Sequence, residues 1–252
     1  EMAVDGDPAK TKWLLLRGSG EYILGAFDGR RFEPEGGPIR NRWGASYYAT
    51  QTFSDAPDGR RVQIGWMNTG KAGAPNSYPG MPFNQQMSIP RELVLRGTPE
   101  GPRLFREPVK ELGGLYAKTH RFERRELAPG ENPLEGISHD LLDIEADIVL
   151  GAARAIRLTL RGEPVEYDVK ERALKGFGVY APVACPDGRL HLRVLLDRAS
   201  IEVFGNHGEA DLSGIFFPHP ENRGLSLVAE GGAATLDRLE IRELRSVWPE
   251  GE

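Results

Sequence analysis

The sequence predicts an all-β protein in two successive parts, a set of antiparallel meanders followed by a two-sheet sandwich. Three observations support this prediction. The 252 residues include 31 glycines and 19 prolines, helical periodicity is nearly absent, and short β-rich runs recur between Gly, Pro, Asp and Asn turns. A chain of this length can bury a substantial core, and two domains are the starting expectation.

The first half contains six runs with the composition of strands. Two of the turns that join them, FDGRRF and APDGRR, carry the Asp-Gly pair that supplies positive φ angles for a tight hairpin. Six antiparallel strands form either a small barrel or two to three blades of a propeller, whose blades have about four strands each. No sharp internal repeat decides between these folds. The runs are KWLLLRG, GEYILGAF, YYATQTF, RRVQIGWM, QQMSIPRELVLR and PRLFREPV.

Residues 107–117, EPVKELGGLYA, hold the only passable helical pattern of the chain. Val109, Leu112 and Tyr116 fall roughly on one side, although a Gly-Gly step weakens the pattern. We expect a short connector here.

Alternating runs follow the connector and predict a second sheet system. In ASIEVF, residues 199–204, the Ala, Ile and Val side chains share one face, while Ser200, Glu202 and Phe204 share the other. This period of two is typical of a half-buried strand. Seven such runs with turn signals between them fit a two-sheet sandwich. The runs are HDLLDIEADIVL, AIRLTLRG, PVEYDVKE, RLHLRVLLD, ASIEVFG, LSLVAEG and TLDRLEIREL.

The charge pattern argues against two kinds of partner. The net charge is -5, and the 32 basic residues are scattered among 37 acidic ones, so no basic stripe is available for nucleic acid. The longest apolar runs, such as WLLL at 13–16, are far shorter than the roughly 20 residues of a membrane span. We therefore expect neither a nucleic-acid nor a membrane partner.

The single cysteine, Cys185, excludes an intrachain disulfide and a cysteine-rich metal site, but it does not fix the compartment. The chain begins at Glu1 and no charged-then-apolar leader follows. A signal peptide is therefore either removed or was never part of this segment. The localisation and the oligomeric state stay open.

Paired carboxylates are the first requirement for cleaving a sugar bond, because one carboxylic acid and one carboxylate must flank the substrate. Asp28, Asp55 and Asp58 lie in or beside turns, where Asp bonds to the backbone. Glu92 follows Arg91 in a strand, which favours a structural ion pair. No acid/base pair is recognisable among the candidates Asp5, Asp7, Asp28, Asp55, Asp58 and Glu92.

Metal ligands and other catalytic signatures are not recognisable either. The histidines are far apart, and none has a ligand-type spacing with another. No nucleophile-elbow serine or phosphate-binding glycine loop occurs. We expect no metal and no cofactor. The five histidines are His120, His139, His191, His207 and His219.

The segment SYYATQTFSDAPDGRRVQIGWMN, residues 46–68, holds two β-prone runs with aromatic residues near their outer ends. Sugar rings present apolar C–H faces and polar edges, which Trp and Tyr side chains suit. Alternation places Val62, Ile64 and Trp66 on one face. From this pattern alone, the favoured interpretation is that Trp66 is the last core residue of that face.

Three stretches, in this order and at this spacing, resemble the C-terminal half of glycoside hydrolase family 32, the family of invertases, levanases, inulinases and related β-fructosidases. The resemblance covers most of the chain. It implies that residues 1–106 form two to three blades of a five-bladed β-propeller, residues 107–118 a connector and residues 119–252 a C-terminal β-sandwich. The stretches are SYYATQTFSDAPDGRRVQIGWMN, MPFNQQMSIPRELVLR and LLDRASIEVFGNHGEADLS.

The resemblance also implies retaining hydrolysis of a terminal β-fructofuranosyl bond in sucrose or in a fructan such as levan or inulin. The family's two aspartates and its glutamate acid/base come from Asn-Asp-Pro, Arg-Asp-Pro and Glu-Cys motifs, and none of these occurs here. Cys185 lies in VACPDG, in the expected sandwich, and does not replace the last motif. This chain alone is therefore expected to be inactive. The family further suggests a secreted or periplasmic location.

Two substrate-binding positions carry over by motif. Tyr48, in YYAT, is similar to the tyrosine that lines the fructosyl subsite, and Trp66, in IGWM, to the tryptophan of the pocket wall. Many members have Asp-x-Gly before this strand, whereas this chain has Arg-Trp-Gly at 42–44, a departure that changes the local polar contacts. The Gly/Pro-rich KAGAPNSYPGMPFNQQ is expected to be a loop that shapes the acceptor side of the site.

The segment LLDRASIEVFGNHGE is expected to be structural. We expect Asp197 and Arg198 to form a local charge pair, Asn206 to be a turn residue, and Glu202 to be a solvated or paired acid. Two alternatives to a glycosidase part stay open. One is a non-catalytic module that binds fructan without cleaving it, and the other is an incomplete gene product with an exposed half-propeller, which should associate or aggregate.

Overall fold

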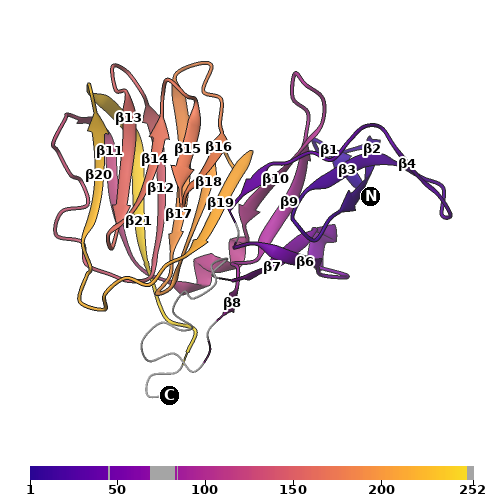
Figure 1. The fold of residues 1–252 in the computed structure, drawn as a ribbon, viewed down its shortest axis with the longest axis horizontal. Helices are drawn as coiled ribbons and strands as arrows, with labels where there is room; N and C mark the ends of the chain where they lie inside the picture. The colour runs from indigo at the N-terminus through magenta and orange to yellow at the C-terminus, as the bar shows by residue number, and fades with distance from the viewer. Residues whose placement is uncertain (45, 69–82, 84, 249–252) are drawn as a thin grey trace.

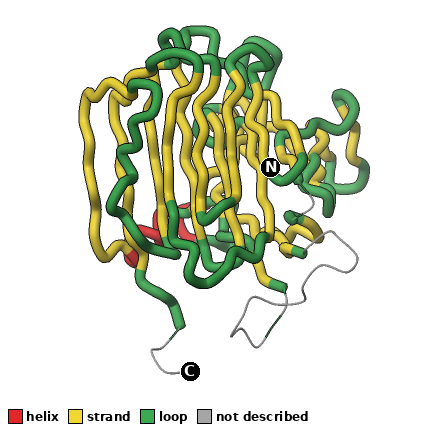
Figure 2. Tube along the Cα trace, turned by 60° about the vertical axis from the view of Figure 1, so that its left-hand side comes forward, coloured by secondary structure: helices red, strands yellow, loops and turns green. Residues whose placement is uncertain are grey.

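The computed structural model describes residues 1–44, 46–68, 83 and 85–248. All but one of the strands of the first half form a nine-stranded sheet, and the strands of the second half form a sandwich of two sheets beside it (Figure 1). Figure 2 shows the long sandwich strands running side by side, with the helical turns at one end of them. The predicted all-β fold with two successive sheet systems is confirmed.

The nine-stranded sheet consists of two antiparallel groups. The first is a meander in the spatial order β4-β3-β2-β1, and the second has the order β6-β7-β9-β10, with the short β8 against β7. A parallel pairing of Val4 with Leu95 joins the groups. The strands are β1 Met2–Val4, β2 Asp7–Leu16, β3 Tyr22–Phe27, β4 Phe32–Pro34, β6 Tyr48–Thr52, β7 Val62–Met67, β8 Gln86–Met87, β9 Arg91–Arg96 and β10 Arg103–Pro108.

Each group contains the four strands of a propeller blade. The described strands do not close into the small barrel that the sequence left possible, so the expectation of two to three blades holds. The predicted Asp-Gly turn in APDGRR is also present, because Asp58 and Gly59 both adopt positive φ angles of 62° and 68°. These two residues belong to a short 3-10 turn, η1 Pro57–Gly59, in a connection longer than a two-residue hairpin loop.

The segment expected to be a short connector contains a 3-10 helix, η2 Lys110–Leu115. The Gly-Gly step inside it disfavours a longer helix. Leu112 is buried and packs with Leu195 and Phe204 of the sandwich in a small hydrophobic cluster. The connector is thereby fastened to the second half.

The second half is a sandwich whose seven-stranded sheet has the order β11-β21-β12-β17-β18-β19-β5, and whose five-stranded sheet has the order β16-β15-β14-β13-β20. The main hydrophobic core draws on both sheets, for example on Leu239 and Leu158. The strands are β11 Tyr116–Leu127, β12 Leu142–Val149, β13 Ala155–Leu160, β14 Glu163–Asp168, β15 Ala173–Gly176, β16 Val179–Pro182, β17 Arg189–Leu196, β18 Ser200–Gly205, β19 Ala210–Ile215, β20 Leu225–Glu230 and β21 Ala234–Leu244.

One strand of the seven-stranded sheet comes from the first half of the chain. Strand β5, Arg42–Trp43, pairs in parallel with β19 through Arg42 opposite Asp211 and Trp43 opposite Leu212. Trp43 also packs against the main sandwich core. The Arg and Trp residues of the segment Arg-Trp-Gly, which departs from the family pattern, therefore form the edge strand of the sandwich sheet.

The expectation that strand β18 is half-buried is wrong, because all six of its residues are buried. The face expected to meet solvent is covered by the connector and by the blades. Phe204 packs against Leu112, and Glu202, which is 2% exposed, forms an ion pair with Arg91. Of the two options given for Glu202, the paired acid is correct.

Two further expectations for this segment have different outcomes. Arg198 does not pair with the Asp197 carboxylate through its guanidinium, which instead lies 3.6 Å from an Asp140 oxygen, and Asp197 accepts the backbone N–H of Arg198 at 2.7 Å. Asn206 is a turn residue as predicted, since it adopts a φ of 47° directly after β18.

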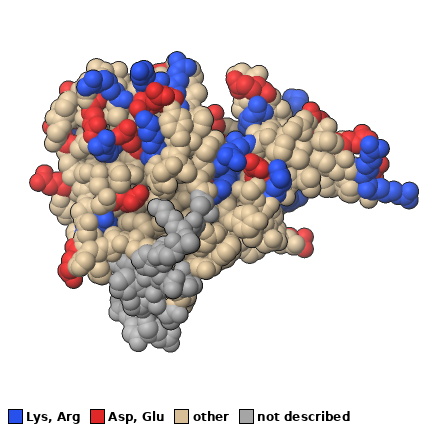
Figure 3. Space-filling view, in the orientation of Figure 1, with Lys and Arg blue, Asp and Glu red and all other residues tan. Residues whose placement is uncertain are grey.

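No helix among the described residues is long and apolar enough to cross a membrane. On the face shown in Figure 3, lysine and arginine side chains lie among aspartates and glutamates over both halves of the molecule.

Candidate functional site

Three side chains lie in one cross-strand row on the second blade. Tyr48 of β6 is directly opposite Trp66 of β7, and Trp66 is directly opposite Met87 of β8. Directly paired residues of antiparallel strands project from the same face of a sheet. Tyr48 and Met87 are about half exposed, at 51% and 49%, and Trp66 is partly buried. We call these three residues the aromatic row.

The aromatic row has the two properties that a sugar-binding wall requires. The Tyr48 and Trp66 ring centroids are 6.4 Å apart, with planes inclined by 59°, so the rings form a bent apolar surface. The Trp66 Nε1–H donates a hydrogen bond of 2.7 Å to Gln85 Oε1, which fixes the indole and leaves amide groups beside it. Apolar ring faces with polar groups at their edges match the C–H faces and hydroxyls of a sugar.

Periodicity alone favoured Trp66 as the last core residue of its face, but the side chain is only partly buried and belongs to none of the hydrophobic core clusters of the described residues. The aromatic residue that fills the core of this hairpin is Tyr47, which is fully buried and donates its hydroxyl to Gln63 Oε1 at 2.9 Å. Sequence reasoning missed Gln85 and Met87. The run QQMSIP contains both, but only the pairing of β8 with β7 places them beside Trp66.

The six carboxylates considered from the sequence have local structural partners or turn conformations. Asp28 accepts the backbone N–H groups of Arg31 and Arg30, and these bonds lower the pKa of its carboxyl group. Glu92 is an ion-pair partner as predicted, with Arg60 Nη1 at 3.3 Å from its Oε2.

The other four also lie in turns or local pairs. Asp5 accepts the Gly97 N–H, Asp7 lies near Lys10, Asp58 lies near Lys110, and Asp55 has a positive φ angle. These contacts and turn positions indicate structural roles for the four carboxylates.

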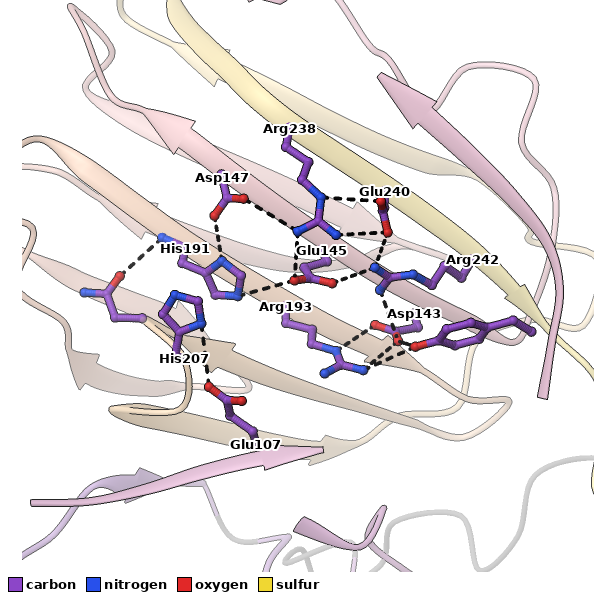
Figure 4. Close-up of polar contacts among 12 residues, drawn as sticks. Glu107, Asp143, Glu145, Asp147, His191, Arg193, His207, Arg238, Glu240 and Arg242 are labelled. Atoms are coloured by element: carbon purple, nitrogen blue, oxygen red, sulfur yellow. Dashed lines mark hydrogen bonds and ion pairs between the residues drawn. The ribbon is translucent and has the colours of Figure 1, made fainter. Parts of the chain in front are cut away.

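Acidic residues are numerous on the seven-stranded sheet, but they belong to a continuous ion-pair network (Figure 4). On the face turned away from the core, Arg242 Nη2 lies 2.7 Å from Glu145 Oε2, and Arg193 Nη2 lies 2.8 Å from Asp143 Oδ2. Their charges are neutralised within the sheet, which indicates a structural role.

The histidines are not all far apart, and this corrects the expectation from sequence spacing. The rings of His191 and His207 are stacked with centroids 3.8 Å apart. The pairing of β17 with β18 explains this in part, because Leu192 lies opposite Gly205, the Asn206 N–H donates to the His191 carbonyl, and His207 follows in the turn. Among the described residues, no group of three or more His, Cys, Asp or Glu side chains is placed to hold a metal ion.

Two cavities lie away from Tyr48 and Trp66. One, of about 270 Å³, lies between β8, the connector and the end of β17, and has a mainly apolar lining that includes Met87, Leu112 and Leu195. The other, of about 450 Å³, lies beside the stacked histidines at the end of the sandwich. Neither Tyr48 nor Trp66 lines either cavity.

Solved structures of two fungal enzymes have the same fold. Exo-inulinase from Aspergillus awamori superposes with a TM-score of 0.78 at 22% identity, over 98% of this chain and 56% of the exo-inulinase. A fructofuranosidase from Schwanniomyces occidentalis, complexed with fructosyl-erythritol, superposes with a TM-score of 0.77 at 17% identity, over 98% of this chain and 59% of that protein. The fold therefore defines a protein with part of a β-propeller followed by a β-sandwich.

Sequence relationships identify the family. A model described as the glycosyl hydrolases family 32 N-terminal domain matches residues 16–108, and one described as the family 32 C terminal matches residues 168–243. A levanase from Bacillus sp. (strain L7) is 32% identical over 290 residues, which include all of this chain and 31% of the levanase. A levanase from Bacillus subtilis (strain 168) is 32% identical over 287 residues, 98% of this chain and 42% of that protein. The chain belongs to glycoside hydrolase family 32, and it spans less than half the length of these levanases.

Proposed function

We propose that this chain is the C-terminal part of a glycoside hydrolase that cleaves terminal β-fructofuranosyl bonds in sucrose or fructans, with retention of configuration. The aromatic row carries this proposal, because Tyr48 and Trp66 are the residues that the family motifs assign to the fructosyl pocket. The separation of 6.4 Å between their ring centroids, and the relationship to two levanases, support that assignment.

In the proposed role, the row binds and orients the fructosyl unit. The Trp66 indole packs against the apolar face of the sugar, and the Gln85 amide that holds the indole also lies within reach of sugar hydroxyls. Restricting the sugar to one orientation lowers the entropic part of the barrier, but bond cleavage itself needs a nucleophilic carboxylate and an acid/base pair.

We propose that the chain by itself has no such pair and does not turn over substrate. The purified chain is incubated with sucrose, levan and inulin, and released fructose is measured. We expect no turnover near the rates of about 1 to 1,000 per second that are typical of enzymes. Release of fructose at such a rate, retained after repeated purification, would overturn this part of the proposal.

A second candidate function is a carbohydrate-binding module that holds fructan without cleaving it, and the exposure of Tyr48 favours it. Calorimetric titration with inulin oligosaccharides measures binding by the intact chain. Trp66→Ala and Tyr48→Ala should each weaken it, by about tenfold, as expected when an aromatic contact worth about 1.5 kcal/mol is lost. Tyr180→Ala, which removes an exposed tyrosine of the sandwich, is the matched control. Absence of binding by the intact chain rejects this candidate.

The third option, an incomplete product, makes a different prediction. Leu15, Phe27 and Phe53 are exposed on the blades, and an unpartnered apolar surface favours association. A monodisperse monomer that melts cooperatively would count against this option.

A further inference from the structure

The buried arginine of strand β9 connects the second blade to the sandwich. Arg91 is 0% exposed, and burying a guanidinium is costly unless charged and hydrogen-bonding partners compensate. Its Nη1 lies 2.6 Å from Asp211 Oδ1, and its Nη2 lies 2.5 Å from Glu202 Oε2 and 2.6 Å from Ser213 Oγ. All three acceptors belong to β18 and β19, so the charge of a blade residue is balanced by the sandwich.

The same guanidinium lies over the ring of Tyr47. The Arg91 Cζ atom is 4.0 Å from the ring centroid, which is within the range of a cation–π contact. Arg91 Nε has no hydrogen-bond partner among the described residues, and a second ring, that of Phe204, lies with its centroid 5.0 Å from Arg91 Cζ. Arg91 thus joins Tyr47 to two carboxylates of the sandwich.

Tyr47 supports the aromatic row from behind. It immediately precedes Tyr48 in the chain, and its ring packs on the backbone of Gly65, which immediately precedes Trp66. A Cβ atom at Gly65 would lie 2.5 Å from the Tyr47 ring, which shows how close the contact is. One buried ring therefore touches the chain next to both sugar-facing aromatic residues.

The backbone of β6 needs this support, because its pairing is irregular where Tyr48 lies. The register to β7 shifts between Tyr48 and Gln51, and Ala49 adopts a positive φ of 48°. A bulged strand end has fewer ladder hydrogen bonds to fix its side chains. Ser46 provides a second link to the sandwich, since its Oγ accepts the Ile215 N–H at 3.3 Å.

We propose that Arg91 is a positioning residue for the aromatic row: it holds Tyr47, and through Tyr47 the Tyr48 and Trp66 rings, in a geometry that depends on Glu202 and Asp211 of the sandwich. The sandwich thereby sets the shape of a surface that it does not itself contribute to. This inference rests on the proposed function only for its claim about sugar affinity, while its claim about ring geometry is independent.

The test compares Arg91→Lys with Arg242→Lys. Arg242 is a matched control, because its side chain is 9% exposed, its guanidinium carbon lies 5.2 Å from the Tyr116 ring centroid, and it pairs with Asp143 and Glu145 within the sandwich sheet (Figure 4). The first readout is the Trp66 indole N–H resonance in a ¹H–¹⁵N spectrum, assigned by its loss in Trp66→Phe. The second is the dissociation constant for inulin oligosaccharides, measured well below both melting temperatures.

We expect Arg91→Lys to move the Trp66 resonance and to weaken binding about fivefold, as is typical for a residue that acts on a ligand site without touching it. Arg242→Lys should lower the melting temperature while leaving both readouts unchanged. Should Arg91→Lys not fold, Ser213→Ala removes one acceptor of Arg91 and should move the same resonance in the same direction by less.

An unchanged Trp66 resonance in folded Arg91→Lys or Ser213→Ala would overturn the proposal, as would an equal shift in Arg242→Lys. If the intact chain binds no sugar, the binding part of the proposed function fails. The resonance then still decides whether Arg91 positions the row.

Discussion

The imidazole rings of His191 and His207 lie face to face, with centroids 3.8 Å apart and planes inclined by 15°. His191 Nδ1 is 2.7 Å from Asp147 Oδ1 on β12, and His207 Nδ1 is 3.6 Å from Glu107 Oε1 on β10. The pair therefore lies where the turn after β18 meets the second blade. Burial lowers the pKa of His207, and the neighbouring His191 lowers it further, while Glu107 opposes both and Arg96 adds to them.

This geometry predicts a dependence of stability on pH. Because the pKa of His207 is lower in the folded chain than its ordinary value of about 6.5, the folded state is favoured above that pH and loses this stabilisation as the pH falls below it. The ring is about half exposed, so the effect is small. When the pH is lowered from 7 to 5, the melting temperature of His207→Gln should fall by about 2 °C less than that of the intact chain. His219→Gln, at an exposed histidine, is the control. The prediction would be contradicted if the melting temperatures of all three proteins fell by the same amount between pH 7 and pH 5.

Close contact at Gly208 makes a second prediction. Gly208 has a φ of 79°, its carbonyl accepts the Arg106 N–H at 3.1 Å, and an added Cβ would lie 2.0 Å from the Arg106 carbonyl oxygen. Gly178 has a similar φ of 71° but open space around its Cα. We expect Gly208→Ala to lower the free energy of unfolding by about 3 kcal/mol or more, and Gly178→Ala by about 1 kcal/mol. Urea unfolding measures both. Equal losses would show that the contact between turn and blade contributes nothing.

The ion-pair network of the sandwich predicts sensitivity to acid. Burial raises the pKa of Glu240, but hydrogen bonds from Arg121 and Arg238 and the charge of Arg242 outweigh it and hold that pKa at about 2. The stabilisation is therefore complete near neutral pH and is lost as the pH falls toward about 2.

Glu240→Gln should lower the free energy of unfolding at pH 7 by about 2 kcal/mol. The difference between the variant and the intact chain should become smaller in acid. Glu33→Gln, which alters an exposed pair, should change it little at any pH. The measurement is chemical unfolding from pH 7 to pH 3, and a difference that stays constant over this range would argue against the network.

A fourth prediction concerns the proposed division into residues 1–106, 107–118 and 119–252. Residues 107–252 produced alone lack β5 and Arg91, so β19 becomes an open sheet edge and the carboxylates of Glu202 and Asp211 lose their buried partner. We expect self-association and a lower melting temperature than in the whole chain. Sedimentation and calorimetry measure these properties. A monomer as stable as the whole chain would show that the sandwich does not depend on the blades.

Local pattern was sufficient to predict many strands and insufficient for their long-range partners. The alternation in residues 199–204 predicts strand β18, but nothing within that segment indicates that Arg91 covers its second face. The long strand β11, Tyr116–Leu127, was not recognised from the sequence. Its charged and polar residues are intermediate or exposed along most of its length, so it lacks an apolar pattern. Contacts between residues more than 100 positions apart depend on how the strands are arranged in the fold, which the sequence of a single segment does not reveal.

The residues of the candidate site were likewise predicted only in part. Tyr48 and Trp66 were recognisable because their motifs surround them directly, and their neighbour Met87 was not, because its strand is only two residues long. The loop expected to shape the acceptor side falls largely on 69–82 and 84, outside the described residues. The assignment of Tyr48 and Trp66 to substrate binding stays a prediction.

Strand β5 has a consequence for how the chain acquires its fold during synthesis. A ribosome releases Arg42 and Trp43 long before it releases β19, the strand with which they pair. Until then this segment has no sheet to join, and the charge of Arg91 has no carboxylate to meet. The segments around Arg42 and Arg91 must therefore wait for β18 and β19, which are made more than 100 residues later, and recombination at a single point between the halves would separate a strand from its sheet.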